Sequence, residues 1–379
     1  MPRLAAIVLA TLLPGAAVSA QTPTPAATAP DPAPLLAKWT GSHGGVPPWD
    51  KVTPAMFPLA FPVAMAEYRR EIHAVRDDSR PATFATVIAP MELAGETMDR
   101  VSAMWGVYSS NLATPAVQAI AREWSPKLSA FYDELFLDPR LFARVKAAYD
   151  TRAAQKLDPQ QLRLLERSYR GFVRRGALLT DAQRSEVSRL NQALSVAYAD
   201  FSQKVLADEE RWILVTDAKQ LAGLPPTFVA SLKAAADERK LAGWAIVNTR
   251  SSVAPVLTYA TDRALRERVW RSFVGRGDNG DANDTKATIA QILQLRQQRA
   301  TLLGFKNHAW LRMDDTMAET PANARALMMR VWPAAVARVR QEVADMQALS
   351  RTEGARITIA PWDYRFYAEK VRKAKYDLD

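Results

Sequence analysis

Apolar residues recur every three or four positions in long runs of this chain, and that spacing restricts it to a mostly α-helical fold. The clearest run covers residues 158–206. Asp158 with Pro159 is typical of a helix N-cap and first helical position, and Thr180 is a typical N-cap of a second helix. Since the connection between the two is short, we predict an antiparallel helical hairpin. Its apolar positions are Leu162, Leu165, Tyr169, Phe172, Val173, Val187, Leu190, Leu194, Ala197, Phe201 and Val205.

The same spacing predicts further helices at 262–274, 283–303, 320–350 and 362–379. Pro333 should kink or split the third of these, because proline removes a backbone hydrogen bond from a helix interior. Two short runs, RWILVT at 211–216 and GWAIVN at 243–248, are typical of short strands. We therefore predict a mostly α fold with long helical hairpins and a small β element.

The first 20 residues have the layout of a secretory signal peptide. Arg3 precedes an apolar run from Leu4 to Leu13, and small residues at 18–20 precede Gln21. A buried N-terminal helix or a membrane anchor is the alternative, but the run is shorter than the ~18 residues that a bilayer span requires. We expect cleavage after Ala20, a periplasmic location and no membrane contact afterwards. The absence of cysteine from the sequence fits this export.

The rest of the chain divides by composition. Residues 21–34, QTPTPAATAPDPAP, form a Pro/Ala-rich stretch that we predict to be a disordered tether. Residues 35–379 are enough for one large domain or two ordinary ones. The formal net charge is +10, but the 50 basic residues are spread among 40 acidic ones along the predicted helices and are not gathered in one run. Ordinary surface charge therefore explains the balance better than a nucleic-acid or membrane partner.

Two loop motifs imitate known sites. GRGDNG has Gly275, Gly277 and Gly280 in the G-x-G-x-x-G spacing, but it follows a predicted helix, whereas a dinucleotide site follows a strand. Counting a calcium loop from Asp278 puts Ile289 where an EF-hand needs glutamate. TGSHGGVPPWD at 40–50 contains a serine and a histidine but is not G-x-S-x-G. We interpret both stretches as ordinary loops.

Titratable residues form no local constellation either. The sequence has three histidines, His43, His73 and His308, and none has another histidine at helical spacing. The sequence also has no cysteine that could complete a set of zinc ligands. The acidic run Asp208-Glu209-Glu210 could supply paired carboxylates, but adjacent side chains point in different directions on a helix. We therefore interpret this run as a solvated helix end. Spacing alone assigns no catalytic or metal-binding residue.

Seven stretches nevertheless resemble a known family, in its order and across residues 35–379. These stretches resemble the N-terminal half of peptidyl-dipeptidases (dipeptidyl carboxypeptidases), relatives of thimet oligopeptidase and oligopeptidase A among the zinc metallopeptidases. The form of the closing stretch is nearer to the dipeptidyl carboxypeptidase branch. The stretches lie at 39–52, 99–120, 131–150, 190–212, 254–277, 303–321 and 361–379, the last being PWDYRFYAEKVRKAKYDLD.

The resemblance implies a helical, two-lobed shell around a deep channel, in an enzyme that removes dipeptides from the free C-termini of short peptides. Such enzymes hold zinc with the two histidines of H-E-x-x-H and a downstream glutamate, and the glutamate within the motif activates the metal-bound water. Residues 1–379 contain no H-E-x-x-H, and no histidine follows His308. No catalytic, substrate-binding or metal-binding residue can therefore be carried over, and we expect this chain alone to bind no zinc and cleave no peptide.

Two hypotheses follow. The chain is the front of a periplasmic peptidyl-dipeptidase that is truncated before its zinc-binding domain, or it is a naturally short, non-catalytic helical protein that binds peptides. The closing helix lacks a glycine cap and places Asp377 and Asp379 where the helix dipole favours cations, which favours truncation. In that case the missing catalytic half would cover apolar faces on the last three helices. The positions expected to be uncovered are Ile289, Ile292, Leu295, Leu302, Leu327, Val331 and Val339.

Overall fold

The structure is a computed structural model that describes residues 30–42 and 45–376, and most of these residues are helical. The predicted mostly α class is confirmed. The predicted signal peptide, residues 21–29 of the predicted tether, and His43 lie outside the described residues. The short helix α1 (Ala33–Leu36) includes the last two residues of the predicted tether, and Leu35 within it is fully buried.

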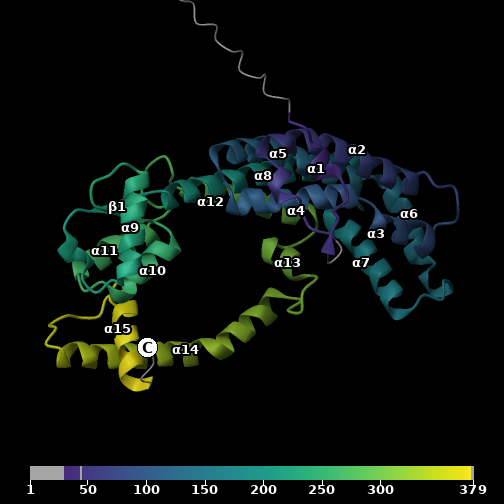
Figure 1. Ribbon diagram of the computed structural model, residues 1–379. Coiled ribbons are helices and arrows are strands. Elements are labelled where there is room, and N and C mark those ends of the chain that lie inside the picture. Colours follow the sequence, from purple (N-terminus) through teal and green to yellow (C-terminus); the bar gives the residue numbers. More distant parts are fainter. Residues whose placement is uncertain (1–29, 43–44, 377–379) are drawn as a thin grey trace, which may run out of the picture.

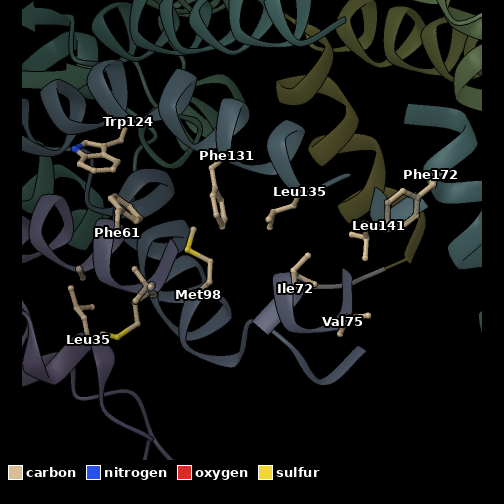
Figure 2. Close-up of a cluster of buried hydrophobic side chains, with 14 of the residues drawn as sticks. Leu35, Phe61, Ile72, Val75, Met98, Trp124, Phe131, Leu135, Leu141 and Phe172 are labelled. Carbon is tan, nitrogen blue, oxygen red and sulfur yellow. The ribbon is translucent and has the colours of Figure 1, made fainter. Parts of the chain in front are cut away.

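A first lobe contains the long helices up to residue 209, together with two later helices that pack on it (Figure 1). Its largest core is a continuous cluster of aliphatic and aromatic side chains, part of which is drawn in Figure 2. Rings in this cluster meet edge to face, as Phe61 and Trp105 do at 5.7 Å. The helices of this lobe are α1, α2 (Phe57–Arg76), α3 (Ala89–Leu93), α4 (Glu96–Asn111), α5 (Pro115–Phe136), α6 (Pro139–Asp150), α7 (Pro159–Arg175), α8 (Asp181–Glu209), α12 (Lys286–Leu302) and α13 (His308–Met313).

The predicted caps of α7 and α8 are confirmed. Asp158 accepts hydrogen bonds from the backbone N–H groups of Gln160 and Gln161, and Thr180 accepts one from Gln183. Gly176 ends α7 with φ of 109°, a left-handed conformation that favours glycine. The predicted packing of these two helices against each other is not what the structure shows.

Each of the two helices has another partner. α7 packs on α6, where Phe172 stacks on Phe142, whereas α8 packs along α5 and α12. The reason is the apolar stripe of α8, in which Leu190 and Leu194 cover residues of α12 that lie a hundred positions away. The short connection between α7 and α8 therefore does not determine which helices they pack against.

The second lobe contains the predicted β element. Strands β1 (Trp212–Val215) and β2 (Trp244–Val247) pair antiparallel, with Trp212 opposite Val247 and Val215 opposite Trp244. Helices α9 (Pro226–Glu238), α10 (Arg250–Tyr259) and α11 (Arg263–Val274) complete the second lobe around a separate small core. Both predicted strands are thus confirmed.

The last two helices connect the lobes. α14 (Pro321–Thr352) starts at the predicted cap Thr320 and runs through Pro333 as one helix, so Pro333 does not split it. The carbonyl of Met329, which Pro333 leaves without a helical donor, lies on an exposed part of the helix where water can bind it. α15 (Tyr364–Tyr376) packs on α10 and on the second half of α14. Among the described residues, none of the helices combines the length and hydrophobicity of a bilayer span.

Candidate functional site

The described residues do not fit a zinc site. Within 30–42 and 45–376, no group of three or more His, Asp or Glu side chains could hold a metal ion. His73 lies in α2, and His308 is the first residue of α13. Burial lowers the pKa of His308, and the nearby guanidinium groups of Arg296, Arg299 and Arg312 lower it further. A neutral histidine beside three cations is a poor place for a metal cation.

The GRGDNG loop joins α11 to α12, as an ordinary interhelical loop should. Its Gly277 has φ of 70°, and the N–H of Gly277 donates to a carboxylate of the protein itself, that of Asp208, at 2.7 Å. The acidic side chains of the loop are also occupied, since Lys286 pairs with Asp278 and Asp284. The loop therefore has neither a free phosphate cradle nor a calcium cage.

The position of Asp208 shows that the interpretation of residues 208–210 as a solvated helix end is wrong for this residue. We expected a solvated helix end, but the Asp208 side chain is buried and accepts hydrogen bonds from Gly277 N (2.7 Å), Asn279 Nδ2 (2.9 Å) and Asn283 Nδ2 (3.2 Å). Arg211 balances its charge at 3.0 Å. The carboxylate thus holds the 277–283 loop in place. Only Glu210 of the predicted acidic run is exposed.

A second buried carboxylate fastens α15 to the second lobe. Asp363 is 0% exposed and accepts hydrogen bonds from Arg263 (2.9 Å), from Arg266 (2.8 Å) and from the N–H of Ala360 (3.1 Å). Arg266 is itself only 2% exposed, and its guanidinium lies 4.1 Å from the ring centre of Phe366. We call Arg263, Arg266 and Asp363 the Asp363 clamp.

Burial of Asp363 alone would raise its pKa. Its hydrogen bonds from Arg263, Arg266 and Ala360 outweigh burial, so the net pKa is lowered. The carboxylate is therefore ionised at neutral pH, as the two guanidinium groups require.

A cationic cavity of about 600 Å3 lies among α5, α7, α8, α12 and α13. Arg174 is the one arginine of this cavity with a carboxylate within 4 Å among the described residues, at 3.4 Å from Asp314 and 3.7 Å from Asp315. Arg299 Nη1 donates to Asn191 at 2.9 Å, and Asn191 Nδ2 donates to Asp133 at 2.8 Å. We call this space the arginine cavity, after its lining residues Arg167, Arg174, Arg175, Arg299 and Arg312.

An exposed apolar surface lies on α14. Its first 20 residues are exposed on nearly all sides, and Figure 1 shows this part of the helix running alone from α13 toward α15. Leu327 and Val331 are 60% exposed and Trp332 is 62% exposed. A helix that is apolar on several sides normally has neighbours. We call Leu327, Met328, Met329, Val331, Trp332 and Val339 the α14 strip.

The predicted exposure of the other two helices is wrong in large part. Ile292 and Leu295 of α12 are buried against α8, although Ile289 remains exposed. On α15, Phe366 and Tyr367 are buried with Met346 of α14. The exposure predicted for Leu327, Val331 and Val339 is confirmed.

Comparison with known proteins supports the resemblance seen in the sequence. Residues 256–379 match the model of Peptidase family M3. The chain is 32% identical to dipeptidyl carboxypeptidase of Escherichia coli over 335 residues, which cover 88% of this chain and 49% of that protein. The chain is homologous to the M3 peptidases.

Two further relatives align with the same share of this chain. Oligopeptidase A of Escherichia coli is 25% identical, and a probable cytosolic oligopeptidase A of Arabidopsis thaliana is 28% identical, each over 88% of this chain. The chain spans about half the length of the curated relatives it matches. M3 peptidases are zinc metallopeptidases, but the described residues of this M3 homologue supply no zinc site.

Proposed function

We propose that this M3 homologue is the N-terminal shell of a periplasmic zinc peptidase that removes dipeptides from the free C-termini of short peptides. Its zinc ligands would lie in sequence that follows residue 379. The observation that carries the proposal is the uneven coverage, since 88% of this chain aligns with only 49% of a dipeptidyl carboxypeptidase. The family match at 256–379 supports the same proposal.

The α14 strip gives a physical reason to expect a further segment. Fully burying one large apolar side chain contributes about 1.5–3 kcal/mol. The six side chains of the strip are roughly half exposed, so covering them would contribute about 5–9 kcal/mol. That gain is comparable with the whole net stability of many domains, which is about 5–15 kcal/mol. We propose that the catalytic half of the same protein provides the cover.

The proposal assigns this chain a structural part in the activity. We propose that these residues shape and close the peptide channel and that a later segment cleaves the bond, since the described residues form no group of three or more His, Asp or Glu side chains that could hold the zinc. The Asp363 clamp would keep α15, the last described helix, fixed to the second lobe.

The test is to isolate the natural gene product from its source with an antibody raised against this chain. We expect a protein longer than 379 residues that releases dipeptides from a peptide with a blocked N-terminus and loses this activity with a chelator. The 379-residue chain alone should contain no stoichiometric zinc and release no dipeptide. A natural product of 379 residues without activity would contradict the proposal and favour a short peptide-binding protein.

A further inference from the structure

The arginine cavity has more positive charge than the surrounding protein neutralises. Five arginines and two carboxylates, Asp133 and Asp315, line it. Among the described residues, only Arg174 of the five has a carboxylate within 4 Å. This is unusual in a chain whose described residues form 30 salt bridges, most of them with arginine. The positive charge of the other four arginines is therefore open to an added anion.

Several polar atoms of the cavity also lack hydrogen-bond partners. Arg299 Nε is buried and has no hydrogen-bond acceptor in the described part of the chain. Arg174 Nη1 is also buried and makes no hydrogen bond there, although the carboxylates of Asp314 and Asp315 lie 3.4 and 3.7 Å away. Burial lowers the pKa of Arg299, which shows that its surroundings disfavour the cation. A buried donor without an acceptor costs about 1–3 kcal/mol, so a ligand that supplies acceptors would be favoured.

The chemistry of these donors indicates the ligand. Guanidinium groups present several N–H donors in one plane and match the oxygen pairs of carboxylates and phosphates. Asn191 already fixes Arg299 and Asp133 relative to each other, so part of the cavity is preorganised. We propose that the arginine cavity binds the carboxylate or phosphate groups of a small anionic molecule.

The size of the cavity favours an organic molecule over a single inorganic ion. About 600 Å3 falls within the range of roughly 300–1,000 Å3 that is usual for small-molecule sites. A second cavity of about 700 Å3 adjoins it, since Ser195 and Tyr198 line both. Its wall includes apolar residues such as Val117 and Phe201, so an anionic group in the arginine cavity could carry an apolar extension. This proposal does not depend on the peptidase activity.

The experiment is titration calorimetry of the 379-residue chain with citrate, with inorganic phosphate, and with sodium chloride at matched ionic strength. The variants are Arg312→Gln and Arg167→Gln, whose side chains have no hydrogen bond or ion pair among the described residues and whose loss should not disturb folding. Arg299→Gln tests the buried donor. Arg163→Gln is the matched control, because Arg163 lies exposed on α7, one turn before Arg167 and outside the cavity. Circular dichroism at 222 nm verifies that each variant is folded.

We expect citrate or phosphate to bind and chloride to have no comparable effect. Arg312→Gln, Arg167→Gln and Arg299→Gln should each weaken binding about tenfold, equivalent to about 1.4 kcal/mol, while Arg163→Gln leaves it within twofold. Binding of citrate alone identifies carboxylates as the ligand group, binding of phosphate alone identifies phosphates, and binding of both identifies their shared oxyanion chemistry. The proposal is overturned if neither binds, or if Arg163→Gln weakens binding as much as the cavity variants do.

Discussion

Replacing Asp363 by asparagine should release α15 from the second lobe. The substitution keeps the shape of the side chain but removes the charge that faces Arg263 and Arg266 at 2.9 and 2.8 Å. Arg266 is 2% exposed and would be left as a buried, unpaired cation. Removing one partner of a buried ion pair costs about 3–5 kcal/mol. Most of this cost should fall on α15, because Asp363 lies directly before its first turn.

Hydrogen exchange of the α15 amides measures this effect locally. Since 1.4 kcal/mol corresponds to a factor of ten, a loss of 3 kcal/mol accelerates exchange by more than a hundredfold. The amides of α5 and α8, in the first lobe, should not change. Asp345→Asn is the matched control, because Asp345 also holds α15, through Lys375 at 2.5 Å, but in a pair that is open to solvent. Such pairs contribute about 0–1 kcal/mol.

The pH dependence gives a second readout. Because the pKa of Asp363 is lowered in the folded protein, its contribution is present above its unfolded pKa of about 3.9 and is lost as the pH falls through the folded value. The difference in unfolding free energy between wild type and Asp363→Asn should therefore be constant from pH 7 to 5 and shrink below about pH 4. Equal exchange of α15 in wild type and Asp363→Asn at pH 7 would refute this reasoning.

Three further predictions concern other parts of the chain. Intact-mass measurement of exported protein should show Gln21 at the N-terminus, and retention of residues 1–20 would contradict the signal-peptide prediction. Asp208→Ala should lower the free energy of unfolding in urea by about 3 kcal/mol, because it leaves the donors of the 277–283 loop unpaired, whereas the exposed neighbour variant Glu210→Ala should stay within about 0.5 kcal/mol. Because the α14 strip is exposed, we expect the 379-residue chain to self-associate in light scattering, and Trp332→Lys should reduce this association without lowering the helix content; unchanged association would show that the strip is not the contact.

The sequence predicted local structure well where the residues that determine a helix end or a strand lie close together in the chain. The N-caps Asp158, Thr180 and Thr320 and both strands follow from residues within a few positions of each other. The partner of α8 could not be found this way, because the residues that its stripe covers on α12 are a hundred positions away. An amphipathic stripe shows that a helix has a partner but does not show which helix it is.

The buried charges were missed for the same reason. Asp208 looked like part of an acidic helix end, but its donors come from about 70 positions later. Asp363 and Arg266 are 97 positions apart, and the arginine cavity combines α7, α12 and α13. Only tertiary packing brings such residues together, so no local spacing could have indicated them. The exposure of Leu327, Val331 and Val339 on the α14 strip was predicted, because the resemblance implied a further segment to cover them, but the same reasoning was wrong for Ile292 and Leu295 of α12.

The gene sequence immediately downstream of codon 379 is the most direct test of whether this M3 homologue forms the shell of a peptidase whose zinc site lies in a later segment. If it does, the coding sequence continues beyond codon 379, in the same or a shifted frame, and contains H-E-x-x-H and a downstream glutamate. A stop codon followed by no such motif would contradict the claim.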